Sequence, residues 1–101
     1  MRFFRQPRKI KNIKPETNKV LVTGAVISRK GYAPYRISYT YNGKDMKKKD
    51  KYTFNILVDM NTYVIIEHRN FRNEFLINDN KRHDIEIVYE TNRVTLNTYK
   101  E

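Results

Sequence analysis

Apolar and polar residues alternate in short segments along most of this chain, and this two-residue period constrains the fold more than any other feature. Such alternation is typical of β-strands that bury one face, and no segment shows a convincing 3.6-residue helical period. Short segments separated by turn residues such as Asn42-Gly43 predict an all-β protein. The alternation covers residues 35–41, 52–58, 63–68, 84–89 and 93–98, with a short apolar piece at 74–77.

The segment before these, residues 19–28, predicts a long first strand that is apolar on both faces. Gly24 lies in its middle, where we expect the strand to bend or to carry a bulge. A long bent first strand fits a small closed barrel. The smallest architecture that fits residues 19–101 is a five-stranded, OB-like barrel, and an SH3-like barrel is the main alternative.

Length and composition exclude several classes of protein. A chain of 101 residues fits one domain, and the lack of cysteine excludes a disulfide framework, a thiolate zinc site and a cysteine nucleophile. Glu67 and His68 are neighbours on a strand and therefore point to opposite faces, so they make no acid–base pair. We expect no enzymatic activity, no metal, no cofactor and no small-molecule substrate. No stretch approaches 18 consecutive apolar residues, so we expect no membrane partner.

Positive charge is concentrated in the first half of the chain. The formal net charge is +10, and residues 1–51 hold 15 basic and 3 acidic residues against 6 and 8 in residues 52–101. Such an imbalance favours a polyanion such as RNA or DNA as partner. Lys, Asn, Ile and Tyr supply 41 of the 101 residues. Because these residues use A/T-rich codons, we expect an AT-rich genome, such as that of an organelle, an endosymbiont or a phage.

Two further segments carry much of this charge. Residues 1–18 contain six basic residues, one acid and two prolines, so we expect a tail that orders only on a partner. This Arg-rich start also has the charge of a mitochondrial presequence, although it has no serine and Pro7 interrupts it. Residues 44–51 contain five lysines and are expected to form an exposed loop. The tyrosines of residues 35–41 are expected mainly in the core, with base stacking as the alternative.

The end of the first strand offers a more specific pattern. Ser28 and Lys30 lie on one side of the strand, where a hydroxyl and an ammonium can meet a phosphate, while Arg29 projects to the other side. The pattern G-x-V-x-S-x-K, from Gly24 to Lys30, resembles that of the bacterial-type small-subunit ribosomal protein seventeen family. The segment Tyr63–Arg69 is similar to that family's late strand.

The resemblance extends over residues 20–77 and includes a basic stretch at Lys49, Lys51 and Tyr52. Asn70 and Asn73 depart from the family's usual Pro and Ser-Lys, as in a divergent organellar member. The resemblance implies an OB fold and a structural role in the small ribosomal subunit, in a mitochondrion more readily than in bacterial cytoplasm. It also implies ribosomal RNA and neighbouring ribosomal proteins as partners.

The resemblance and the charge distribution together give a set of candidate RNA-binding residues. Ser28, Arg29, Lys30 and Arg69 follow from the family pattern. The others follow from the tail, the lysine-rich stretch and the late strand: Arg2, Arg5, Arg8, Lys9, Lys11, Lys14, Lys44, Lys47, Lys48, Lys49, Lys51 and Arg72.

Two alternative functions remain open on the sequence. One is a phage or plasmid protein that binds single-stranded nucleic acid, or a virion protein, on a small β-barrel. Stacking aromatics on an exposed face would favour it, whereas phosphate contacts from loops and tail would favour the ribosome. The other is an accessory subunit of an organellar membrane complex, which the lack of an amphipathic run disfavours.

Overall fold

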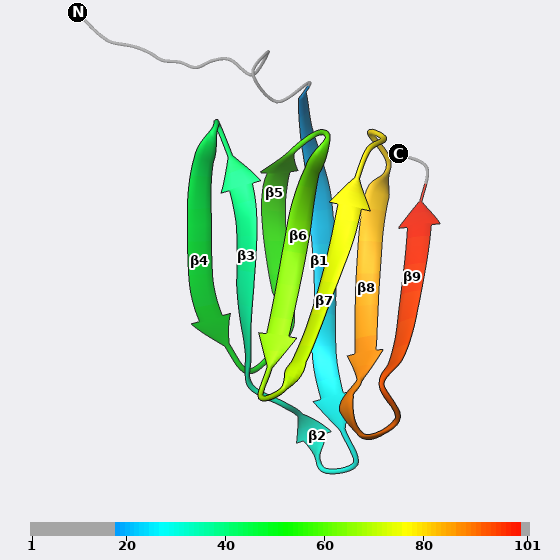
Figure 1. Cartoon of the computed structure of the whole chain (residues 1–101). Coiled ribbons are helices and arrows are strands. Elements are labelled where there is room, and N and C mark those ends of the chain that lie inside the picture. Colours follow the sequence, from blue (N-terminus) through cyan, green and yellow to red (C-terminus); the bar gives the residue numbers. More distant parts are fainter. Residues whose placement is uncertain (1–17, 100–101) are drawn as a thin grey trace, which may run out of the picture.

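The computed structural model describes residues 18–99, which form nine strands and one short 3-10 helix (Figure 1). The elements, in chain order, are β1 (Lys19–Ser28), β2 (Gly31–Tyr32), β3 (Tyr35–Tyr41), β4 (Lys44–Asp50), β5 (Phe54–Asp59), β6 (Thr62–His68), β7 (Phe71–Ile77), β8 (Arg82–Val88), η2 (Tyr89–Thr91) and β9 (Arg93–Tyr99). The predicted all-β class is confirmed.

The strands divide into two sheets that pack face to face (Figure 1). In sheet A, β1 is central: it pairs in parallel with β8, which is followed by β9, and its other side pairs antiparallel with β5 and β2. Sheet B is antiparallel, with strand order β4-β3-β6-β7. The smallest architecture expected from the sequence has five strands in one barrel, whereas these nine strands form two separate sheets.

The core lies between the two sheets and follows the two-residue period of the sequence. Sheet A contributes buried side chains such as Val22 and Ile85, and sheet B contributes others such as Ile37 and Ile66, all with no exposed surface. Each of these residues alternates with a side chain on the outer face of its sheet. Burial of one face per sheet therefore fixes the register of every strand.

The lysine-rich stretch is a strand, and the prediction of a loop there is wrong. Asn42 and Gly43 both have positive φ, +54° and +76°, and Tyr41 pairs with Lys44 across them. Two such residues form the tight turn whose twist suits a hairpin, so β4 continues directly from β3. All of β4 except Asp50 is exposed, because β4 is the edge strand of sheet B.

Gly24 carries no bulge, because the pairing of β1 with β8 continues in register through this residue. It pairs with Phe54 on one side and with Ile85 on the other, inside a continuous ten-residue strand. The residue is required for another reason: a Cβ atom there would overlap the Ile85 carbonyl oxygen and stand 2.8 Å from the Phe54 ring. Gly24 therefore allows the close approach of the neighbouring strands.

Candidate nucleic-acid interface

An open groove follows β3 on the outer face of sheet B. Ser38 and Thr40, which are small and half-buried, line its floor. Lys47 of β4 lies on one side, because its register places it opposite Ser38, and Tyr63 and Ile65 of β6 lie on the other. The volume of the groove is about 610 Å³. Small side chains between two rows of longer ones thus create a channel along the strand.

The channel continues toward the end of the molecule where β4 and β6 finish. A second hollow of about 470 Å³ is lined by Arg36, Lys47, Lys49 and Glu67. A third, of about 310 Å³, is lined by Arg36, Lys49, Glu67 and, from the turn after β6, Arg69. Shared lining residues connect the three hollows, so positive side chains accompany the channel over most of its length.

Asp45 lines the first hollow and Asp50 the third, and the acidic residue common to all three hollows is Glu67. Its carboxylate lies 4.0 Å from the Arg36 guanidinium and 3.8 Å from that of Arg72, and Arg72 also pairs with Glu74. These side chains are all partly exposed, so the attraction between them is screened by solvent. The two arginines are held in place on the sheet face but remain accessible to a stronger anion.

The lysines of β4 are divided between the two sides of that strand. Lys47 and Lys49 share the outer face with Arg36 and Ser38, whereas Lys44 and Lys48 lie on the other side of the strand, in register with Tyr41 and Ile37. The register therefore places Lys47 and Lys49 on the face of the channel, and Lys48 also contributes to the lining of the second hollow. Within residues 18–99, no acidic side chain forms a salt bridge with any lysine of β4.

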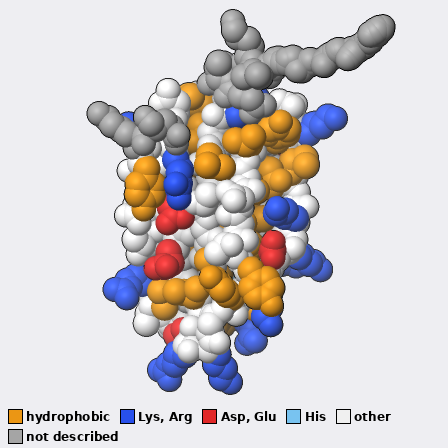
Figure 2. Space-filling view, turned by 180° about the vertical axis from the view of Figure 1, so that it is seen from behind, with side chains coloured by type: hydrophobic (Ala, Val, Ile, Leu, Met, Phe, Trp, Pro, Cys, Tyr) orange, Lys and Arg blue, Asp and Glu red, His pale blue; other side chains and the backbone are white. Residues whose placement is uncertain are grey.

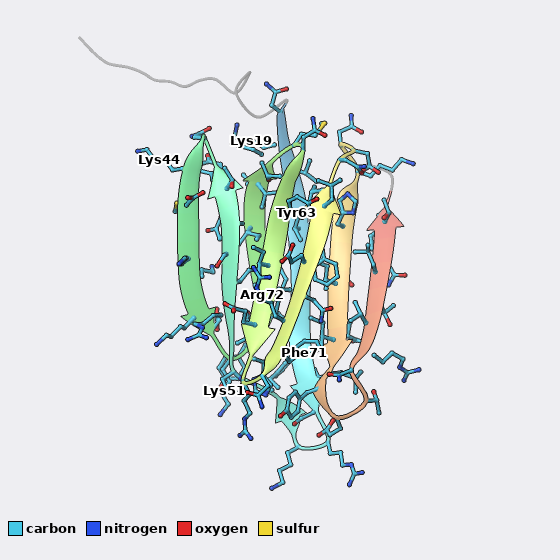
Figure 3. All side chains as sticks on the ribbon, viewed as in Figure 1. Lys19, Lys44, Lys51, Tyr63, Phe71 and Arg72 are labelled. Carbon is cyan, nitrogen blue, oxygen red and sulfur yellow. The ribbon has the colours of Figure 1, made fainter. Side chains whose placement is uncertain are left out.

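Tyr63 is the exposed aromatic residue of the channel, whose lining also includes the half-buried Tyr39. The Tyr63 side chain is 52% exposed, and Figure 3 shows it on the face of sheet B that also carries Arg72. Tyr35, in contrast, is buried, its hydroxyl donates to the Tyr52 carbonyl at 2.8 Å, and burial together with the Asp50 charge raises the pKa of its phenol. Tyr39 packs against the core.

The turn between β1 and β2 holds the segment singled out by the family pattern. The Ser28 hydroxyl donates to the Gly31 carbonyl and accepts the Lys30 N–H, both at 3.2 Å, so it closes the turn. The expected free hydroxyl for a phosphate is therefore already engaged. The Arg29 N–H donates to the Glu90 carboxylate at 2.7 Å, and this hydrogen bond lowers the pKa of Glu90. The side chains of Arg29 and Lys30 are exposed.

Several predicted residues meet at one end of the molecule, although they are distant in sequence. The β1–β2 turn, the end of β4 and the β6–β7 turn all lie at the lower end in Figure 1, and Lys51 lies there in Figure 3. This end therefore carries Arg29, Lys30, Lys51 and Arg69, whereas Lys44 lies at the opposite end of sheet B. The Arg69 guanidinium stacks 5.9 Å from the centre of the Tyr89 ring.

The outer face of sheet A has a different character. Figure 2 shows a central strip of polar side chains and backbone with acidic groups on both sides, and basic groups mostly toward the margin. Asp84 and Glu86 of β8 belong to this face, and the Thr23 hydroxyl donates to Asp84 at 2.7 Å. The alternation of residues along β8 thus places acidic side chains on the outer face of sheet A.

Sequence reasoning missed two residues of the channel, Arg36 and Tyr63. The signal for both was present in the alternation, because Arg36 stands between the buried Tyr35 and Ile37 and therefore points outward. Tyr63 likewise alternates with the buried Val64. The candidate residues of the tail, from Arg2 to Lys14, lie outside the described residues.

Groups that could support other chemistry are sparse in the described part of the chain. His68 is buried, with Nδ1 paired to the Pro34 carbonyl and the ring edge-on to Tyr89, so it lies across the sheet from Glu67. Residues 18–99 contain no cluster of three or more His, Cys, Asp or Glu side chains that could hold a metal ion. Over the same residues, no helix has the length and apolar character needed to cross a membrane.

Comparisons of the chain with protein-family models, with curated proteins and with solved structures gave no match.

Proposed function

We propose that this protein binds single-stranded nucleic acid along the β3 channel of sheet B. The observation that carries the proposal is that the exposed Tyr63 ring and the Lys47 side chain line the two sides of one groove. Nonspecific single-strand sites combine a positive groove for the backbone with aromatic rings on which bases stack. The channel contains both elements on one face.

The shape of the channel favours an unpaired strand over a duplex. It is open and lies on a sheet face, so a base can reach the Tyr63 ring only if the face of that base is free. In a duplex, neighbouring base pairs cover those faces. Lys47, Lys49 and Arg36 can contact phosphates on one side of the channel, and the Ser38 and Thr40 hydroxyls can hydrogen-bond to base edges or sugars.

Titration of a fluorescently labelled single-stranded oligonucleotide, with a hairpin duplex of equal length for comparison, tests the proposal. We expect tighter binding of the single strand at equal salt. Tyr63→Ala should weaken that binding by about 1–3 kcal/mol, as for loss of one stacked base. Tyr63→Phe keeps the ring and should bind as wild type. Equal affinity of Tyr63→Ala and Tyr63→Phe, or preference for the duplex, would contradict the proposal.

Ribosomal RNA of the small subunit is the second candidate, as the family resemblance implies. The observation that favours it is the group of positive side chains at one end of the molecule, on Arg29, Lys30, Lys51 and Arg69. Folded RNA is bound mainly through its backbone and shape, for which such a basic end is suited. Here the protein would be a structural constituent of a mitochondrial ribosome, next to other ribosomal proteins.

Co-sedimentation in a gentle lysate separates the two candidates. A ribosomal protein should run with the small subunit, and replacing Arg29 and Lys30 by Ala should release it. A single-strand-binding protein should be released from its sediment by nuclease or by competing oligonucleotide. Its co-sedimentation should be weakened more by Tyr63→Ala than by replacing Arg29 and Lys30 with Ala. Recovery only in the soluble fraction, without bound nucleic acid, would rule out the ribosomal assignment.

A further inference from the structure

One edge of sheet A is left open along its whole length. β9 pairs with β8 on one side, and no other strand of residues 18–99 pairs with its second side. All of β9 except Val94 is exposed, and Leu96 keeps 48% of its surface. Unpaired edge N–H and C=O groups are a template on which another strand can add.

The other edge strands of the described chain are short or carry features that oppose such addition, and β2 has only two residues. β4 has four lysines, the residue type that natural proteins most often place on open edges. β7 presents Arg72 and Glu74, held in salt bridges. At the end of β5, Asp59 accepts the backbone N–H groups of Asn42 and Gly43, which anchors the tip of the β3–β4 hairpin there.

β9 has no such feature. Within it, the six residues from Val94 to Tyr99 contain no charge, no proline and no glycine, and two of them are threonines that suit a strand. The β8–β9 pair is also neutral, since Arg82 and Arg93 offset Asp84 and Glu86. A protein of net charge +10 therefore presents at this edge a strand whose only charge is Arg93 at its start, so two copies can approach with little repulsion.

We propose that β9 pairs antiparallel with β9 of a second copy of this chain, which joins the two sheets A into one continuous sheet. The strand is self-complementary when the two-fold axis passes beside Leu96. Leu96 then meets its own counterpart, Thr95 meets Asn97, and Val94 meets Thr98. No two like charges stand opposite each other, so the pairing carries no electrostatic penalty of the kind that opposes wrong registers.

The ends of the paired strands fit as well. Arg93 of one copy lies opposite Tyr99 of the other on the outer face, because both residues share that face with Thr95 and Asn97. Tyr99 already receives one guanidinium, that of Arg82 at 5.1 Å from its ring centre. In the dimer its other side meets the second copy's Arg93, an arrangement that repeats the same cation–aromatic contact across the new interface.

The inner side of the joined strands gains apolar contact. Leu96 and Val94 point to the core side of sheet A, since they pair with the buried Ile85 and Ile87. Sheet B leaves Leu96 half uncovered at the edge. The two Leu96 side chains would cover each other there, which removes apolar surface from water.

If the nucleic-acid proposal also holds, the dimer has a consequence for it. A two-fold axis between antiparallel strands stands perpendicular to the sheet, so both sheets B lie on the same side of the extended sheet A. The two β3 channels then open on the same side of the dimer. One nucleic-acid strand could occupy both channels and so bind with higher avidity than a single channel allows. The dimer itself does not depend on this and is measured without nucleic acid.

Sedimentation velocity of the full chain, over micromolar to submillimolar concentrations, tests the association. We expect a monomer–dimer equilibrium that Leu96→Lys shifts toward monomer by at least about tenfold in Kd, because two buried ammonium groups would face each other. Leu57→Lys on β5 and Leu76→Lys on β7 are matched controls at similarly exposed leucines of other edges. A monomer at all concentrations, or equal loss of dimer in Leu57→Lys, would overturn the proposal.

A cysteine cross-link tests the register and does not rely on a charged variant that could unfold. The chain has no cysteine, so Leu96→Cys carries one thiol. Opposed residues of an antiparallel pair have Cα atoms about 4.5–5.5 Å apart, within the range that a disulfide spans. Mild oxidation should give a covalent dimer with Leu96→Cys and far less with Leu76→Cys. Equal yields from the two variants would refute the pairing.

Discussion

The carbonyl oxygen of Ile85 in β8 occupies the space that a Cβ atom of Gly24 in β1 would need. The two residues are in register in the parallel β1–β8 pair, and the Phe54 ring closes the same space from β5. The centre of sheet A therefore tolerates only glycine at this position. The backbone conformation of Gly24 is not the reason, because the positive-φ glycines of the described chain are Gly31 and Gly43.

Gly24→Ala should accordingly destabilise the domain through overpacking. We expect a loss of about 1–3 kcal/mol in the free energy of unfolding, as for other overfilled sites, measured by urea melts. Asn55→Ala, at an exposed position of β5 opposite Thr23, is the matched control and should stay within about 0.5 kcal/mol of wild type. A harmless Gly24→Ala would mean that β1, β5 and β8 are not packed as described.

The division of the β4 lysines between two sides predicts a difference between variants of equal charge. Lys47→Ala with Lys49→Ala removes two lysines that face the channel, so the slope of log affinity against log salt should fall by about 1–1.5 units for a single strand. Lys44→Ala with Lys48→Ala removes the same charge from the other side and should change the slope less. Identical slopes for the two double variants would show that only net charge matters.

Glu67 gives the opposite expectation, since it is the acidic residue common to all three hollows of the channel. Glu67→Gln removes the charge that engages Arg36 and Arg72, so the Arg36 guanidinium becomes available to phosphate, while Arg72 keeps its salt bridge with Glu74. We expect tighter binding of a single-stranded oligonucleotide, by about threefold to tenfold, together with a steeper salt dependence. Glu86→Gln changes the charge equally on the outer face of sheet A and serves as control. A gain of the same size in Glu86→Gln would argue against a channel on sheet B.

The Asp59 carboxylate links stability to pH. Burial alone raises the pKa of this group, but hydrogen bonds from the Gly43 and Asn42 N–H groups and the Lys19 ammonium, 3.2 Å away, outweigh burial and hold the pKa below its ordinary value of 3.8. A carboxyl with a lowered pKa stabilises the folded state at pH values above 3.8. That contribution is lost as the pH falls through the folded-state pKa.

Asp59→Asn should therefore lower stability at neutral pH by about 1 kcal/mol and reduce the dependence of stability on pH below 4. Urea melts of wild type and variant between neutral and acidic pH measure both effects, and the two curves should converge as the pH falls. Asp45→Asn, at an exposed position of β4, is the control. Parallel curves for wild type and Asp59→Asn over the whole pH range would contradict this role of Asp59.

The sequence was sufficient for the features that depend on neighbouring residues. Alternation in residues 35–41 and 63–68 predicted β3 and β6 and which side of each is buried, because side chains on a strand alternate between two faces. The Asn42-Gly43 turn followed from the need for positive φ in a two-residue hairpin. The opposite orientation of Glu67 and His68 followed from the same periodicity.

The tertiary structure decided what depends on distant partners. The lysines of residues 44–51 have no apolar alternation, yet they form β4, because the hairpin turn sets them against β3 and an edge strand need not bury a face. Gly24 could indicate a bulge or a close approach, and only its position in register between Phe54 and Ile85 selects the second. Backbone pairing across the chain overrides local preference in both cases.

The grouping of residues in the channel also could not be predicted from the sequence. Arg36, Lys47 and Tyr63 belong to three strands, and their meeting on one face depends on the register of β3 with β4 and with β6. The composition fixed the charge of the protein and the alternation fixed which side chains face outward. Which outward-facing side chains become neighbours was decided by strand order, since pairing between strands is set by the burial of the shared core and not by any segment alone.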